Sequence, residues 1–441
     1  MSLRENFDPG VYGITHTKQL CIRKPVKYEY IYLLLFSLLI MGACTVPYEL
    51  SQRNLAVLYD EKAGFTGPEY TLHHLSDSGS VLYYSLQLHD FSYQKAETDP
   101  VYRARIRLKV LIRDSYESKP VEDSLIVLIT DSAHFQHNYI LTDSLLLTLP
   151  TGYEKLLELV LTDMNSSQEV THYLMAYKVY EGDQQFFLAR GLDGNPLYRP
   201  YITEGEAFTL EAPSGHTGNL LVRYYHRAFP IAIPPFAVDY GESFDYREDS
   251  LFSLPLQDGK TGVLAFRRPG FYHFQADSSR KEGFSLFLHG SDFPRITTVD
   301  GTLEPLRYIT TSREYQALTS AASIKLAIDS FWLENCGNIN RARAQIAKYY
   351  NRVQDANRYF TSYLEGWKTD RGMIYMIFGP PTHVFRDINT ENWVYGDAGY
   401  SLSLRFSFVR VDNPFTYNDF NLYRNPTYKE VWYHAVENWR R

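Results

Sequence analysis

The chain has 441 residues and a formal net charge of −7 at pH 7. This acidic balance argues against a nucleic-acid partner, which would require a basic stripe or patch. With 44% hydrophobic and 15% aromatic residues the chain can bury several cores, and its length predicts about three domains. The 37 tyrosines and 26 phenylalanines favour strands and interfaces over a helical bundle.

The N-terminal segment has the layout of an export signal. An apolar run covers residues 31–41, which is too short to span a bilayer, because a spanning helix needs roughly 20 residues. The run is preceded by the basic residues Arg23, Lys24 and Lys27 and followed by small residues, as in a secretory signal peptide. Met41-Gly-Ala-Cys44 resembles a lipobox, so we expect residues 1–44 to be a signal peptide and Cys44 to carry a diacylglyceryl anchor. The alternative is a plain signal peptide with an incidental cysteine.

A short tether over residues 45–54 leads into a predicted β-sandwich domain over residues 55–182. The strand at residues 103–112 alternates basic and apolar side chains with period two, so one face is buried and the other is solvated. Further strands are predicted at residues 81–91, 124–130, 139–149, 156–162 and 171–180. This spacing is typical of an antiparallel sandwich. The row of basic residues is read as a solvated strand face, with binding to anionic lipid or glycan as the alternative.

A second β domain is predicted over residues 183–308. Short strands are expected at residues 251–256, 262–266, 270–275 and 285–289. The apolar, proline-rich stretch at residues 231–236 cannot lie in a central strand. It is expected to be an edge or a loop, which either marks a contact surface or packs within a domain interface.

Helical spacing begins near residue 310 and opens the third predicted domain, residues 309–441. One helix is expected from Ser312 to Asn335, with Gly337 just past its end, and a second from residues 338–340 to Gly366. Together they form a helical hairpin. Cys336 lies at the turn and is expected to be a small buried thiol; since Cys21 and Cys44 belong to the targeting segment, the mature chain has no disulfide partner for it.

The rest of this domain alternates short helices and strands. Thr369 or Asp370 is expected to cap a helix over residues 371–378, which Gly379-Pro-Pro381 ends, although the apolar stretch also allows a strand. A hairpin over residues 383–386 and 392–395, a strand over residues 401–411 and a helix over residues 427–440 follow. The sequence thus predicts a multidomain fold, mainly β and then α+β, with β-sandwich modules followed by a helical hairpin and a small α+β domain.

The pentad Gly366-Trp-Lys-Thr-Asp370 resembles the signature of the GWxTD family. Other motifs extend the resemblance over residues 329–441: Trp332 with Cys336-Gly-Asn338, Tyr349-Tyr-Asn-Arg-Val353 with Ala356-Asn357, Phe378-Gly-Pro-Pro381, Trp393-Val-Tyr395, and Val431-Trp432 with Trp439-Arg440. Members look like envelope proteins of Gram-negative bacteria, and the resemblance carries no established activity. It implies that the following motif residues form fold core or a docking surface: Gly366, Trp367, Thr369, Asp370, Arg371, Gly379, Pro380, Trp393 and Tyr395.

A catalytic site is the alternative to this structural interpretation. Asp370 and His383 are an acid and a base, and Trp367 suits a sugar face. Each residue also has a local structural role, and no nucleophile elbow, phosphate loop or metal spacing is present, so no catalytic residue is assigned. The histidine pairs 73–74 and 134/137 lack a third ligand, and neither a metal nor a cofactor is expected.

These observations predict a lipid-anchored envelope protein that binds rather than catalyses, and whose partners are the membrane and other envelope proteins. The residues after Cys44 contain no acidic cluster, so we expect an outer-membrane anchor that faces the periplasm. The alternative is an envelope hydrolase or carbohydrate-binding protein with Asp370 as acid or base. An open Asp370 beside Trp367 favours the alternative, and a buried, hydrogen-bonded Asp370 favours the binding protein.

Overall fold

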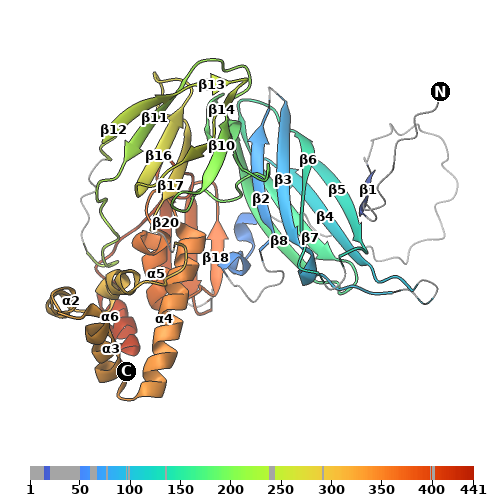
Figure 1. Cartoon of the computed structure of the whole chain (residues 1–441). Coiled ribbons are helices and arrows are strands. Elements are labelled where there is room, and N and C mark those ends of the chain that lie inside the picture. The colour runs from blue at the N-terminus through green and yellow to red at the C-terminus, as the bar shows by residue number, and fades with distance from the viewer. Residues whose placement is uncertain are drawn as a thin grey trace, which may run out of the picture.

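The computed structural model describes residues 14–19 and 50–441, except residues 60–66, 76–77, 96, 98–99, 135–136, 238–243, 291–292, 398 and 400–402. The apolar run, the lipobox and Cys44 lie outside the described residues. Two β-sandwiches lie next to each other, above a C-terminal module of helices and one sheet (Figure 1). The predicted order, mainly β and then α+β, is confirmed. Within the described residues, no helix combines the length and the apolar character needed to cross a bilayer.

The first sandwich packs a five-stranded antiparallel sheet, in the order β1-β5-β4-β7-β8, against the three-stranded sheet β2-β3-β6. The strands are β1 (Ile14–Gln19), β2 (Glu69–His74), β3 (Gly79–Gln87), β4 (Ala104–Arg113), β5 (Asp123–Asp131), β6 (Ile140–Thr148), β7 (Tyr153–Asp163) and β8 (Glu169–Lys178). The period-two prediction for β4 is confirmed, because Ile106, Leu108 and Val110 are fully buried between the sheets. Arg105 on the same strand is exposed.

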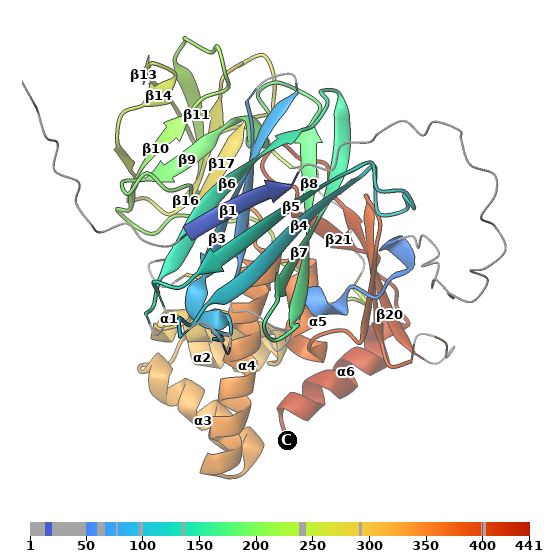
Figure 2. The ribbon, with the colours of Figure 1, turned by 90° about the vertical axis from the view of Figure 1, so that its right-hand side faces the viewer.

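Strand β1 comes from residues that the sequence assigns to the signal peptide. Its backbone pairs antiparallel with β5, from Ile14 opposite Asp131 to Gln19 opposite Ile126 (Figure 2). Strand β5 would become the edge of this sheet in a chain cleaved before Cys44.

The second sandwich has its own core, so the two β regions are separate units. One sheet has the order β13-β14-β10-β15, with β9 also paired to β10, and the other has the order β12-β11-β16-β17. The strands are β9 (Leu188–Gly191), β10 (Ala207–Glu211), β11 (Leu220–Tyr225), β12 (Ser250–Leu254), β13 (Leu256–Gln257), β14 (Lys260–Thr261), β15 (Leu264–Ala265), β16 (Gly270–Gln275) and β17 (Phe284–Leu288). The sequence missed β9, β10 and β11, which are short and interrupted by long connections. The 3-10 helix η4 (Gln184–Phe186) connects the two sandwiches.

In its described residues, the C-terminal module has six α-helices and the antiparallel sheet β18-β19-β20-β21. Its elements are α1 (Val299–Leu303), α2 (Ser312–Thr319), α3 (Ile324–Cys336), α4 (Ile339–Phe360), α5 (Asp370–Phe378), α6 (Tyr428–Trp439), β18 (His383–Arg386), β19 (Thr390–Tyr395), β20 (Leu404–Arg410) and β21 (Phe420–Leu422). The first helix of the predicted hairpin is divided into α2 and α3. The division lies at polar residues, because the Ser320 hydroxyl bonds back to Gln316 and Ser323 caps the new helix. Cys336 is a buried free thiol, as expected.

Two segments from outside the C-terminal module are packed onto it. The predicted domain boundary assigned residues 55–59 to the first sandwich, but Leu55 and Tyr59 lie in the core of the C-terminal module. Asn54 fixes them there, since its side-chain oxygen accepts the backbone N–H of Val384 at 2.9 Å. The stretch 231–236 is a loop whose Ala232 N–H donates to the carbonyl of Lys368 at 2.8 Å, which confirms the interpretation as interface packing.

Candidate functional site

Gly366 begins the pentad at a point where the chain touches helix α4. A Cβ on Gly366 would lie 1.8 Å from the carbonyl oxygen of Ala356, far inside contact distance. Gly372 is under the same steric constraint, because a Cβ on it would lie 1.9 Å from the carbonyl oxygen of Gly366. Glycine at these positions therefore allows three backbone segments, α4, the pentad and α5, to pack directly on one another.

Trp367 is a core residue, with only 2% of its surface exposed. Its backbone N–H donates to the side chain of Asn357, and its carbonyl accepts the Tyr308 hydroxyl. Lys368, at the variable position of the pentad, forms ion pairs with Glu304 and Glu365 on the surface of the module. The indole is thus unavailable as a ligand platform.

Thr369 is the N-cap of α5, as predicted. Its hydroxyl accepts the N–H of Gly372 at 3.1 Å and donates to the carbonyl of Gly366 at 2.8 Å. Asp370 is the first helical residue and is 6% exposed. Its carboxylate binds Arg424 with both oxygens, at 2.6 and 3.1 Å, and accepts the N–H of Leu422 at 2.7 Å. Asp370 therefore joins α5 to the segment after β21.

Arg424 extends this connection to the second sandwich. Its guanidinium also approaches the carbonyl of Ile233 at 3.4 Å, and the neighbouring N–H of Asn425 donates to the carbonyl of Pro235 at 3.0 Å. Both carbonyls belong to the loop that leaves the second sandwich and returns to it. The pentad thus lies at the joint where α4, α5, β21 and this loop meet.

Arg371 and Glu391 form the centre of a second buried cluster. Arg371 donates to Glu391 at 3.0 Å and to the side chain of Asn418 at 2.5 Å. Glu391, which is fully buried on β19, also accepts from Arg386, Tyr59 and Trp393. Burial works to raise the pKa of Glu391, but the charges of Arg386 and Arg371 and the hydrogen bonds outweigh it and hold the pKa at about 2.

The remaining motif residues terminate α5 and fix the hairpin. Gly379 follows the helix with a φ of 87°, and its carbonyl accepts the Tyr395 hydroxyl at 2.8 Å. Arg352 from α4 donates to the last carbonyls of α5, at Met376 and Ile377. Pro380 is exposed and Trp393 is fully buried. These residues form the fold core or its boundary.

The structure does not bring Asp370 and His383 together. Asp370 bonds to β21 and His383 begins β18, and these two strands are the opposite edges of the four-stranded sheet. Three strand spacings separate the edges by roughly 14 Å. No group of three or more potential metal ligands was found among the described residues. His74 of the first histidine pair is buried and bonds to Ser80 and Gln185.

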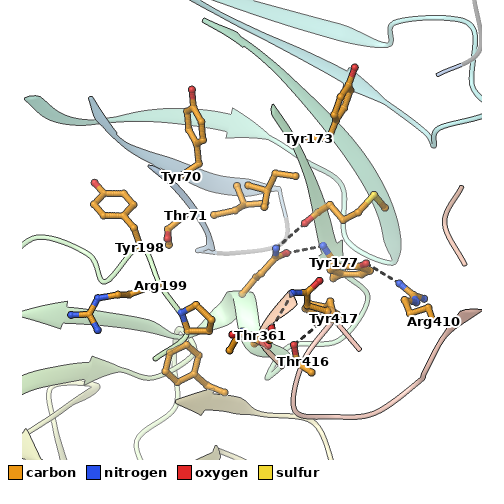
Figure 3. Close-up of a pocket in the computed structure, with 18 of the residues that line it drawn as sticks. Tyr70, Thr71, Tyr173, Tyr177, Tyr198, Arg199, Thr361, Arg410, Thr416 and Tyr417 are labelled. Atoms are coloured by element: carbon orange, nitrogen blue, oxygen red, sulfur yellow. Dashed lines mark hydrogen bonds between the residues drawn. The ribbon is translucent and has the colours of Figure 1, made fainter. Parts of the chain in front are cut away.

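A cleft of about 380 Å³ lies where the two sandwiches and the C-terminal module meet (Figure 3). The cleft is lined by β2 and β8 of the first sandwich, the connecting helix η4, β9 of the second sandwich, and the C-terminal loops around Asp387 and Tyr417. The tyrosines that line it are Tyr70, Tyr116, Tyr173, Tyr177, Tyr198 and Tyr417. Tyr177 and Tyr417 stack across the interface, with ring centroids 3.7 Å apart.

The comparisons with known proteins decide the family. A model described as the GWxTD domain matches residues 270–441. The chain is a GWxTD domain-containing protein. The match begins with the first residue of β16, so the GWxTD domain includes the last two strands of the second sandwich, which the sequence resemblance had not covered.

The other comparisons of this GWxTD protein concern curated proteins and solved structures. No curated protein matches it. Red sea bream transglutaminase is 10% identical over 51% of this chain and 31% of its own length, with a TM-score of 0.18. The C-terminal domain of the Streptococcus agalactiae AgI/II polypeptide BspA is 10% identical over 49% of this chain and 91% of its own length, with a TM-score of 0.17. At these scores neither structure informs the fold or the function.

Sequence reasoning missed the partners of the motif residues. Arg424, Glu391 and Tyr59 lie outside the pentad, and their roles depend on contacts between distant segments. One signal was present for Glu391: it lies two residues before Trp393, on the same face of β19. An acidic side chain on the buried face of a strand requires a cationic partner.

Proposed function

We propose that this GWxTD protein is a lipid-anchored, non-enzymatic component of the bacterial cell envelope that binds other envelope proteins. Acylation at Cys44 would hold it on a membrane, and the absence of an acidic cluster after Cys44 supports an outer-membrane anchor that faces the periplasm. The two sandwiches would supply binding surfaces, and the GWxTD domain would fix them relative to each other.

The observation that carries this proposal is the state of Asp370. An acid or base must reach the proton that it transfers. Asp370 is instead 6% exposed, and both its oxygens accept hydrogen bonds from Arg424. This geometry favours a structural pentad over the alternative of a hydrolase that uses Asp370.

Lipidation is tested with the full-length protein in a Gram-negative host fed an alkyne-bearing fatty acid. We expect label on the wild-type protein and its recovery in the outer-membrane fraction, with both lost in the Cys44→Ser variant. Equal labelling and equal membrane recovery of the two proteins would overturn the assignment of the anchor.

Binding is tested by cross-linking in intact cells, followed by affinity purification from detergent-solubilised membranes. We expect the wild-type protein to retain a defined set of envelope proteins that the Cys44→Ser variant, expressed at the same level, does not retain. A wild-type sample with no protein enriched over this control would contradict a role in an assembly.

A further inference from the structure

Strand β5 loses a neighbour when the leader is removed. In the larger sheet of the first sandwich it pairs with β4 on one side and with β1 on the other. Cleavage before Cys44, which belongs to the proposed function, takes residues 14–19 away. One row of backbone N–H and C=O groups on β5 is then left without partners, and such a row is a template for pairing with another chain.

The edge lacks the devices that usually block strand addition. From Ser124 to Thr130 the sequence is Ser-Leu-Ile-Val-Leu-Ile-Thr, with no charged residue, proline or glycine. Charges, prolines and bulges are the ordinary means by which a sheet edge avoids pairing. The six residues of β1, from Ile14 opposite Asp131 to Gln19 opposite Ile126, show that an antiparallel strand fits here (Figure 2).

The side chains beside the edge combine exposed apolar groups with cations. Ile126 and Leu128 are each 37% exposed on the outer face of the sheet. On the neighbouring strand β4, Lys109 lies opposite Ile126, and Arg105 lies on the same face, opposite Thr130. Neither cation has a carboxylate within ion-pair distance among the described residues.

These cations can reach a strand that is added to β5. Such a strand would lie two strand spacings, roughly 10 Å, from β4. The long stems of Lys109 and Arg105 can extend over β5 and bring their charges to acidic side chains on the outer face of the added strand. Arg107, between them, instead donates to the hydroxyl of Thr162 on β7 at 3.3 Å. The edge therefore favours a segment with acidic outward side chains.

A second copy of the chain is a poorer occupant of this edge. If two β5 strands paired antiparallel with full overlap, Asp123 of each copy would lie opposite Asp131 of the other. Like charges directly opposite each other destabilise a strand pair. A different chain with acidic residues placed toward β4 avoids this repulsion at the strand ends.

We propose that the β5 edge of the processed protein takes up an extended segment of a partner protein as an added antiparallel strand, whose outward acidic side chains pair with Arg105 and Lys109. In this mode of recognition the backbone hydrogen bonds supply affinity and alternate side chains supply selectivity. The inference rests on the proposed function and deepens it, because it names the surface and the kind of segment by which an envelope partner is held.

The test titrates a short peptide of alternating glutamate and valine into the processed, lipidated protein in detergent at low salt. We expect saturable binding and slower hydrogen exchange of the backbone amides at residues 124–130. The same peptide with proline at its central valine keeps its charge but cannot complete the ladder, and should bind about tenfold more weakly. Absence of binding, or equal binding of the two peptides, would overturn strand addition.

Substitutions test the two cations. Arg105→Gln combined with Lys109→Gln should weaken peptide binding about fivefold, the effect of losing two exposed ion pairs. The matched control combines Arg343→Gln and Lys429→Gln, which remove the same charge from exposed positions on α4 and α6. Thermal melts show that each protein is folded. Equal losses in the two double variants would mean nonspecific attraction and would overturn the role of the cations.

The uncleaved precursor is a second control. We expect the Cys44→Ser variant to keep residues 14–19, which compete for the edge and should weaken peptide binding about tenfold. Mass spectrometry establishes which form has been purified. Equal binding by the precursor and the processed protein would overturn the assignment of the peptide to this edge.

The outcomes separate this inference from the proposed function. A cleaved, lipidated protein that ignores the peptide contradicts the β5 edge alone, whereas a membrane-bound protein that keeps residues 14–19 contradicts the anchor and the open edge together. A processed protein that dimerises without peptide, with the amides of β5 already protected, would assign the edge to a second copy and overturn the partner segment.

Discussion

Asp370 and Arg424, 54 residues apart in the sequence, form an ion pair with two hydrogen bonds of 2.6 and 3.1 Å. The side chains are 6% and 12% exposed. Because the same arginine reaches the loop of the second sandwich at Ile233, the pair connects the pentad to a different unit of the molecule. The acidic end of the GWxTD signature is thus explained by assembly of the fold.

The glycine of the pentad is required by close packing. Gly366→Ala is expected to destabilise the protein by about 3 kcal/mol or more, because the new methyl group would overlap the carbonyl of Ala356. Urea unfolding followed by tryptophan fluorescence measures the change. Gly262→Ala is the control, since no atom lies within 4 Å of its Cβ position, and it should change stability by less than about 0.5 kcal/mol. Similar stability of the two variants would contradict the packing argument.

Glu391 makes stability depend on acid pH. Its pKa is about 2 in the folded protein, below the ordinary value of 4.5, so its contribution is fully present above pH 4.5 and is lost as the pH falls through 2. Between pH 6 and pH 3 this loss amounts to about 2 kcal/mol. Urea unfolding at a series of pH values should show a shallower acid decline for Glu391→Gln, from a lower starting stability. Parallel declines would show that Glu391 does not titrate in this way.

Asp183, which lies just before η4, should make stability change with pH in the opposite direction. Burial raises its pKa to about 6, helped by Glu282, so stability that is present below the ordinary value of 3.8 is lost as the pH rises through 6. Asp183→Asn should therefore stabilise the protein by up to about 3 kcal/mol at pH 8 and leave it nearly unchanged at pH 3.5. Unfolding at the two pH values checks this. The exposed Asp329→Asn should give no such gain, and a gain independent of pH in Asp183→Asn would argue against the titration.

Tyr59 tests whether the segment before the first sandwich belongs to the C-terminal module. Its hydroxyl donates to Glu391 at 2.5 Å, so Tyr59→Phe should cost about 1–2 kcal/mol in unfolding of that module. Tryptophan fluorescence monitors the unfolding, since all five tryptophans lie in the C-terminal module. Tyr153→Phe, at a side chain that is 61% exposed, is the control and should have no measurable effect. Equal stability of these two variants would show that the segment does not stabilise the C-terminal module.

The elements that the sequence predicted well are those specified by neighbouring residues. Thr369 and Gly379 delimit α5 locally, and the alternation of β4 reveals its buried face without knowledge of its partners. The interactions that it did not predict join distant segments. Glu391 meets Arg371 20 residues away and Tyr59 332 residues away, and a single sequence does not contain the geometry of such contacts.

The same reason explains the cleft. In the sequence, each tyrosine that lines the cleft is indistinguishable from an ordinary strand or loop residue. Only the packing of the three units brings these tyrosines around one cavity. The division of the predicted first helix into α2 and α3 had a local signal in Ser320 and Ser323. The sequence prediction of one helix gave more weight to the apolar spacing, which continues across these serines.

A double-mutant cycle on Asp370→Asn and Arg424→Gln, with unfolding free energies from urea titration, tests the central claim most directly. We predict that each single variant loses about 3 kcal/mol, because a buried partner is left unpaired, and that the double variant is more stable than the sum of the losses by about 2 kcal/mol or more. Additive losses, with a coupling below about 0.5 kcal/mol, would contradict the account of the pentad as a structural joint.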